Sequence, residues 1–169
     1  MSGSEKFFRE YHVPEDAVWA DLDDVPEELR RLAKIYATAL NEDDDREVTF
    51  GSIDDFYEVY DQLQGGRCFV AGIAEEDGDR ITTVAKLDIR DGQPFGEGVA
   101  TTHSARGLGM GQYAIHQLLE TVRAEGHDRL TFRAQQRVVE LYRRMGAQLL
   151  ESPDARWPLM AFDVDKKAA

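Results

Sequence analysis

Three glycines alternate along a short stretch of the chain, at Gly107, Gly109 and Gly111, directly before an amphipathic segment. Glycine adopts positive φ angles without strain and lets the backbone approach a ligand closely. A turn of this kind that opens a helix leaves several backbone N–H groups unpaired at the positive end of the helix dipole. Because phosphate groups bind such sites readily, the stretch predicts an anion-binding turn.

The spacing of the glycines narrows the kind of phosphate site. No Gly-Lys-Ser/Thr sequence follows, which argues against a nucleoside-triphosphate loop, and a dinucleotide-binding turn would need glycine where Gln112 stands. The remaining pattern is Arg-x-x-Gly-x-Gly, from Arg106 to Gly111. A glycine-rich loop that only turns the chain is the alternative interpretation.

A second pattern lies after the helix that the turn is expected to open. That helix ends near Gly126, and the alternating residues 130–134 predict a short strand. Apolar residues then recur at helical spacing up to Gly146, within the sequence Leu-Tyr-x-x-x-Gly. They are Val138, Val139, Leu141, Tyr142 and Met145.

These two patterns, in this order, resemble motifs A and B of the GNAT N-acetyltransferase superfamily. The resemblance covers residues 95–150, and the pair Ala134-Gln135 is similar to a subgroup that includes the ElaA-like acetyltransferases. It implies an α/β (α+β) fold in which helices flank a central mixed, mostly antiparallel sheet. It also implies an N-acetyltransferase that moves an acetyl group from acetyl-CoA to a primary amine of a small molecule or peptide.

The resemblance implies a place for each part of acetyl-CoA, and it implies no metal. The amides of the glycine turn would bind the pyrophosphate, with Arg106 adding a charge. Backbone groups at the end of the preceding strand would pair with the pantetheine arm. The implied cofactor-binding residues are Val99, Ala100, Thr101, Arg106, Gly107, Leu108, Gly109, Met110, Gly111 and Gln135.

Tyr142 is the first candidate catalytic residue, because it aligns with the general acid of the family. A phenol with an ordinary pKa of about 10 is a suitable proton donor to a departing thiolate. A core tyrosine on a short amphipathic helix is the alternative. Ala147 stands where an aromatic residue commonly follows the Leu-Tyr-x-x-x-Gly sequence, and this departure leaves room for a chain that keeps the fold without the chemistry.

Glu97 is the second candidate, as general base. Regular strand alternation places Glu97 on one face with Phe95, Val99 and Thr101, and so directs it toward the cofactor-facing residues. The glycines on either side of Glu97 weaken this strand or mark a bulge. A solvated carboxylate is the alternative for Glu97, and His103 could relay a proton or be an exposed turn histidine.

The acidic composition limits the classes of partner that the protein is expected to bind. The 169 residues include 33 Asp and Glu against 20 Lys and Arg, so the formal net charge is −13. Such a surface repels nucleic acid and anionic membranes. It favours either a cationic, amine-bearing substrate or, as we prefer, a halophilic protein in a salt-rich cytoplasm. No apolar stretch approaches the roughly 20 residues that cross a bilayer, so a cytoplasmic location is expected.

The remaining elements are predicted from periodicity, and the whole chain, 1–169, is interpreted as one domain. Residues 1–25 would form a first strand or an extended arm. Two helices then follow, from Pro26 to the acidic run after Asn41 and from the N-cap Ser52 to Leu63. The predicted strands are 68–73, 80–89, 95–102, 130–134, 147–151 and 159–164. The single cysteine, Cys68, is expected to be a buried strand thiol.

Two functions remain open at this level. The first is the acetyl-CoA-dependent N-acetyltransferase, with an amine acceptor that no motif identifies. The second is a catalytically idle protein of the same fold that works as an interaction or structural subunit of a larger assembly, with residues 1–25 as its arm. A homodimer is compatible with either function, since homodimers are frequent among the proteins that this chain resembles.

Overall fold

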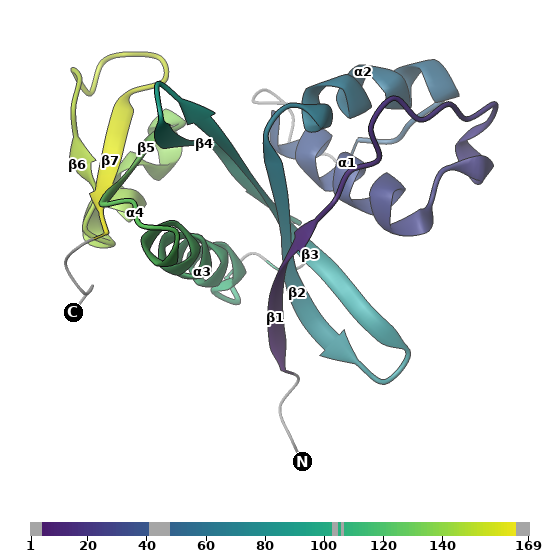
Figure 1. The fold of residues 1–169 in the computed structure, drawn as a ribbon, viewed down its shortest axis with the longest axis horizontal. Coiled ribbons are helices and arrows are strands. Elements are labelled where there is room, and N and C mark those ends of the chain that lie inside the picture. The colour runs from purple at the N-terminus through teal and green to yellow at the C-terminus, as the bar shows by residue number, and fades with distance from the viewer. Residues whose placement is uncertain (1–4, 41–47, 103–104, 106, 165–169) are drawn as a thin grey trace.

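A computed structural model describes residues 5–40, 48–102, 105 and 107–164 of the chain. Among these residues, seven strands form one sheet in the order β1-β2-β3-β4-β5-β7-β6. All neighbouring pairs are antiparallel except β4 and β5, which are parallel. The predicted mixed, mostly antiparallel sheet is therefore confirmed (Figure 1).

The order of elements along the chain agrees with the predicted order. The strands are β1 (Lys6–Tyr11), β2 (Arg67–Glu75), β3 (Gly78–Arg90), β4 (Gln93–Thr101), β5 (Arg129–Arg133), β6 (Gln148–Leu149) and β7 (Leu159–Asp163). The helices are α1 (Glu27–Leu40), α2 (Ile53–Gln64), α3 (Met110–Ala124) and α4 (Val139–Arg144). None of the helices in the described ranges is both long enough and apolar enough to cross a membrane.

Local sequence explains where α2 begins and ends. The Ser52 hydroxyl accepts a hydrogen bond from the backbone N–H of Asp55 at 3.3 Å, which confirms the predicted N-cap. At the other end, Gly66 takes a φ of 75°, and a Cβ at this position would lie 2.6 Å from the carbonyl oxygen of Leu87. Only glycine fits this turn between α2 and β2.

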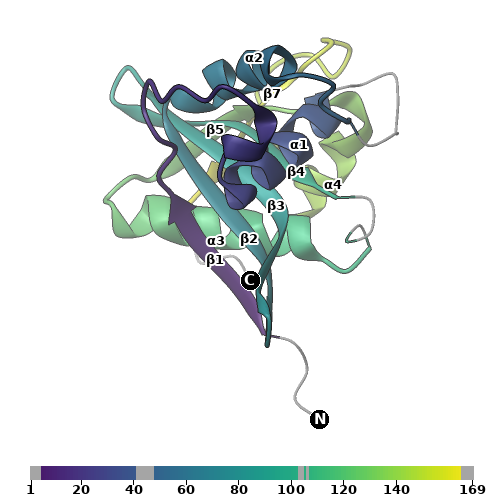
Figure 2. The same ribbon diagram turned by 90° about the vertical axis from the view of Figure 1, so that its right-hand side faces the viewer.

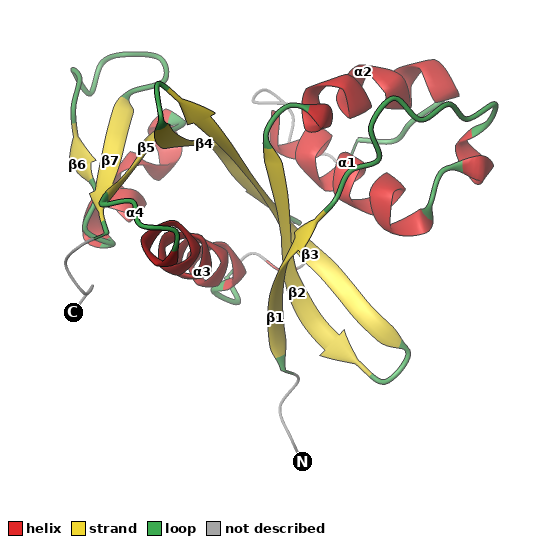
Figure 3. Ribbon diagram, in the orientation of Figure 1, coloured by secondary structure: helices red, strands yellow, loops and turns green. Residues whose placement is uncertain are grey.

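Helices cover both faces of the sheet. α1 and α2 pack on one face, whereas α3 crosses the other (Figures 2 and 3). The alternation of β3 divides the core in the same way: Val84 packs with Leu32 of α1 and Phe56 of α2, while Ala85 packs with Leu118 of α3. The sheet thus separates two apolar layers.

The segment between β1 and α1 is bound to α2. Tyr57 accepts a hydrogen bond from the backbone N–H of Trp19 at 2.6 Å and donates one to its carbonyl at 3.1 Å. The Trp19 ring lies edge-on to Phe56 and Tyr60, with centroids 5.9 and 5.3 Å apart. The prediction of a first strand is confirmed by β1, and the described residues after it lie on the molecule instead of projecting as an arm.

Cys68 is buried in β2, as expected, and this placement predicts a chemically silent thiol. Cys68 is 2% exposed, and burial raises the pKa of its thiol to about 12, so the reactive thiolate is scarce at neutral pH. We expect no labelling by an aromatic disulfide reagent at pH 8 in the native protein, and one equivalent after unfolding in guanidinium. Rapid stoichiometric labelling of the folded protein would contradict this burial.

Candidate active site

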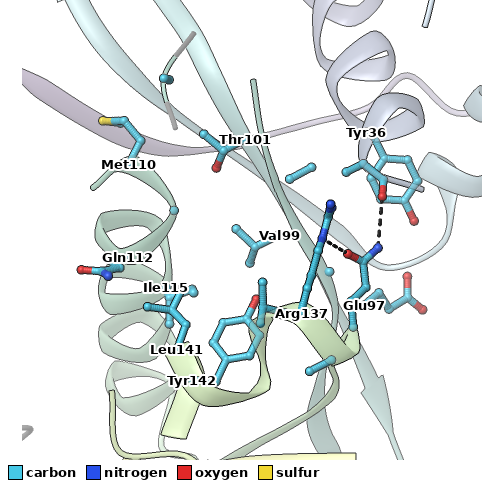
Figure 4. A pocket seen from close by; sticks show the side chains of 18 of the residues that line it. Tyr36, Glu97, Val99, Thr101, Met110, Gln112, Ile115, Arg137, Leu141 and Tyr142 are labelled. Atoms are coloured by element: carbon cyan, nitrogen blue, oxygen red, sulfur yellow. Dashed lines mark hydrogen bonds between the residues drawn. The ribbon is translucent and has the colours of Figure 1, made fainter. Parts of the chain in front are cut away.

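A cavity opens where β4 and β5 part from each other. The two parallel strands are in register only at Phe95 with Thr131 and at Gly96 with Phe132. Past these pairs the cavity has a volume of about 640 Å³, and residues of α1, β4, α3, β5 and α4 line it (Figure 4). Such a volume is typical of a small-molecule site.

The glycine turn forms one end of this cavity. Gly107 and Gly109 have φ angles of 84° and 75°, as the alternating glycines predicted, and Gly109 is the N-cap of α3. The first amide bonded within the helix is that of Tyr113, which donates to the Gly109 carbonyl at 2.9 Å. The amides of residues 110–112 precede it and have no partner within the helix. Unpaired amides at a helix N-terminus can bind an anion, so this end of the cavity is suited to one.

The start of α3 also lies close to the end of β4. A Cβ added to Gly111 would come within 3.3 Å of the Thr101 hydroxyl oxygen, which is tighter than an ordinary contact. The third glycine of the motif therefore serves close packing of helix on strand. A bulkier residue would push the amides away from the end of β4.

Eight of the ten predicted cofactor-binding residues line the cavity. They are Val99, Ala100, Thr101, Gly107, Gly109, Met110, Gly111 and Gln135. Leu108 is not among the lining residues and is 55% exposed. Arg106 lies outside the described residues, and so does His103.

Gln135 is held in place from two sides. Its amide nitrogen donates to the Ala39 carbonyl of α1 at 3.2 Å, and its amide oxygen accepts from Nε of Arg137 at 2.9 Å. It thereby connects the end of α1 to the short 3-10 turn Gln136–Val138 that leads into α4. These two hydrogen bonds hold the Gln135 side chain in the cavity wall.

Tyr142 extends from α4 into the cavity, on the side of Val99 (Figure 4). Its ring packs edge-on against Phe132 of β5, with centroids 5.0 Å apart, and against Phe162 of β7 at 6.4 Å. Burial raises the pKa of the phenol to about 12. Tyr142 therefore carries its proton throughout the physiological pH range and can donate it.

Glu97 lies at a bulge, and the prediction that it shares a face with Val99 and Thr101 is wrong, whereas it stays on the side of Phe95, since Arg90 contacts both residues. Lys86 pairs with Gly98 and Leu87 with Gly96, so Glu97 is an extra residue on β4. The extra residue reverses the alternation along the strand. Val99 packs toward α3, whereas Glu97 pairs with Lys86, whose ammonium group lies over the Tyr36 ring on the α1 face. Glu97 still lines the cavity, from the other face of the strand.

Several residues of the cavity wall carry little or no signal in the sequence. Tyr36 and Ala39 belong to the apolar side of α1, and their periodicity only predicts burial. Arg137 and Trp157 lie in segments without periodicity, so no pattern points to them. Arg133 lies near the end of the segment 130–134, which was predicted as a strand. This place at a strand end was the one sequence signal for a residue that lines the cavity.

The comparison with protein families agrees with this geometry. The model of the Acetyltransferase (GNAT) family matches residues 29–147, well over half of the chain. The chain therefore belongs to the GNAT family, which identifies it as an acetyltransferase. No curated protein matches the chain.

Solved structures show the same fold at low sequence identity. The protein yncA from Salmonella typhimurium, solved with its cofactor acetyl-CoA, is 18% identical with a TM-score of 0.61, and 98% of each chain is covered. An acetyltransferase of the GNAT family from Staphylococcus aureus is 13% identical with a TM-score of 0.61, over 95% of this chain and 99% of that one. A third structure, titled histone acetyltransferase HPA2 and related acetyltransferase, from Corynebacterium glutamicum, is 22% identical with a TM-score of 0.56, over 81% and 91%.

Proposed function

We propose that this protein is an acetyl-CoA-dependent N-acetyltransferase that acts on a primary amine of a small molecule or peptide. The observation that carries the proposal is the convergence of three groups on one cavity. The glycine turn supplies anion-binding amides, Tyr142 supplies a protonated phenol, and Glu97 supplies a carboxylate from the opposite face of β4.

The residues present suit the shape and charge of acetyl-CoA. The amides at the start of α3 would hold the pyrophosphate, and the strand end 99–101 would pair with the pantetheine arm where β5 no longer pairs with β4. Val99, Ile115 and Leu141 give the middle of the cavity an apolar lining. Gln135 closes the wall between this arm and α1.

Acetyl transfer needs one proton acceptor and one proton donor, and the chain offers both. Acetyl-CoA would supply the acyl group as a thioester: the C–N bond to the amine forms while the C–S bond breaks. Glu97 would accept the proton that the amine loses, directly or through a water molecule. Tyr142 would give its proton to the departing thiolate. Holding both groups at one cavity lowers the entropic part of the barrier.

The surroundings of the protein are part of the same proposal. A salt-rich cytoplasm would suit the net charge of −13, because counterions screen the repulsion among the carboxylates. We therefore expect the purified protein to be most stable in molar KCl. Thermal unfolding in KCl from 0.1 to 3 M measures this, and a Tm that does not rise with salt would contradict it.

A panel of primary amines tests the proposed reaction. The purified protein is incubated with acetyl-CoA and each amine in molar KCl, free thiol release is followed, and the acetylated product is identified by mass spectrometry. We expect amine-dependent thiol release above the rate without amine for at least one class of acceptor. If a folded protein binds acetyl-CoA and acetylates nothing in a panel of amino acids, polyamines, aminoglycosides and peptides, the proposed activity is wrong.

A further inference from the structure

Lys86 is a buried lysine for which the reaction above has no role. It lies in the middle of β3 and is 2% exposed, on the face of the sheet that α1 and α2 cover. Its ammonium group donates to the Gln62 carbonyl in the last turn of α2 and lies 6.0 Å from the centre of the Tyr36 ring. A charge in such a place is unfavourable unless each of its donors is satisfied.

The third partner of Lys86 is the carboxylate that lines the cavity. Nζ of Lys86 lies 3.0 Å from Oε2 of Glu97, directly at the bulge of β4. The other oxygen, Oε1, is 3.2 Å from Nη2 of Arg90, whose side chain is half exposed and lies over the Phe95 ring. Glu97 thus pairs with a buried cation, Lys86, through one oxygen and with a half-exposed cation, Arg90, through the other.

Stability alone does not account for this arrangement. A buried ion pair is often no more stabilising than apolar side chains of the same volume. The bulge would leave Glu97 free to point to solvent, because the residue has no paired partner on β3. The ion pair with Lys86 keeps the Glu97 carboxylate at the cavity wall and away from solvent. The Gln62 carbonyl of α2 holds Lys86 in place in turn.

We propose that Lys86 is a positioning residue, which holds the Glu97 carboxylate at the cavity wall so that it can accept the proton of the acceptor amine. This inference rests on the proposed function. Lys86 acts through Glu97 and is not itself among the residues that line the large cavity. Because Tyr36 also faces Glu97, the burial of Tyr36 and then the charge of Glu97 raise the pKa of that phenol, to about 12. Lys86 and Arg90 of β3 and Tyr36 of α1 therefore all face this carboxylate.

The test compares Lys86→Met, Glu97→Gln and the double variant with the wild type. We expect Lys86→Met to bind acetyl-CoA as the wild type does and to lose at least about tenfold in kcat, less than the ~10²–10⁴-fold expected on removal of the base. The KM for the amine stays close to the wild-type value, because Lys86 lies outside the lining of the cavity and only the position of the carboxylate is lost. A purely structural lysine would lower the Tm and leave the kcat of the folded protein unchanged.

The double variant separates positioning from folding. Glu97→Gln leaves the Lys86 ammonium buried without its carboxylate, so we expect a lowered Tm that Lys86→Met partly restores in the double variant. Turnover of the double variant is no lower than that of Glu97→Gln, since Lys86 has nothing left to position. Even if Glu97→Gln alone fails to fold, Lys86→Met and the double variant keep the comparison.

The control removes another ion pair of the same strand. Arg80→Met breaks the exposed contact with Glu75, 2.7 Å long, at the far end of β3, and leaves turnover and the pH profile unchanged. A folded Lys86→Met protein with wild-type kcat would overturn the positioning role alone. A folded wild type that acetylates no amine would overturn both this role and the proposed function.

Discussion

Gly109→Glu is expected to abolish acetyl-CoA binding while the protein still folds. Gly109 caps α3 with a φ of 75°, and a side chain there would begin in open space beside the first amides of the helix. A carboxylate at this point occupies the anion-binding end and repels the pyrophosphate. We expect calorimetric titration to show an affinity at least about 100-fold weaker, which corresponds to roughly 2.8 kcal/mol.

Gly92→Glu is the matched control for that loss. Gly92 lies in the turn between β3 and β4 with a φ of 76°, and a Cβ there also meets open space. The two variants add the same charge to the same backbone conformation, at about 1–2 kcal/mol of strain each. Gly92→Glu should therefore lower the Tm similarly and bind acetyl-CoA normally. Equal binding by both variants would mean that the glycine turn only turns the chain.

Tyr142→Phe is expected to lower kcat by about 10²–10⁴-fold, the usual contribution of a general acid. The aromatic contacts with Phe132 and Phe162 survive in the variant, because only the hydroxyl is removed. The Tm and the affinity for acetyl-CoA should therefore stay close to wild type. Steady-state kinetics with a turned-over amine, together with calorimetric titration, measure both quantities.

The pH profile gives a second measure of the same role. A donor works while it is protonated, and burial places the pKa of Tyr142 at about 12, so its activity is lost only as the pH approaches that value. If kcat of the wild type falls between pH 8 and 10, a group other than Tyr142 causes the fall. The same fall in kcat should then persist in Tyr142→Phe. The control, Tyr113→Phe, alters an α3 tyrosine that lies under Lys6, and it should leave kcat unchanged. A Tyr142→Phe enzyme with wild-type kcat would remove Tyr142 from the mechanism.

Periodicity predicted most of the fold, because burial of one face is what fixes a helix or a strand in this sheet. Ser52, as N-cap, and the glycines at the ends of α2 and α3 were predicted from local chemistry, which depends on few neighbours. The direction of Glu97 could not be obtained in this way. Gly96 and Gly98, on either side of Glu97, indicated a bulge or a weakened strand, but the extra residue is defined by pairing with β3, across the sheet.

Those parts of the candidate site that belong to one continuous motif could be predicted from the sequence. Those parts that form where distant segments meet could not. The turn 107–111 and Tyr142 each belong to one continuous motif, and both line the cavity. In the sequence Lys86 is one of several polar residues of β3, and its importance appears only through Gln62 and Glu97, which other elements bring to it. Contacts of this kind depend on tertiary packing, on which a single sequence carries no local signal.

The two register pairs between β4 and β5 have a mechanical consequence. They are the only strand pairing between the block β1–β4 and the block β5–β7 in the described residues, so backbone hydrogen bonding joins the blocks over a very short seam. α3 contacts β2, β3, β4 and β5 and therefore spans that seam. The helix whose first amides lie at one end of the cavity is thus also a brace between the two blocks. A ligand bound by those amides would therefore also act on the contact between the two blocks.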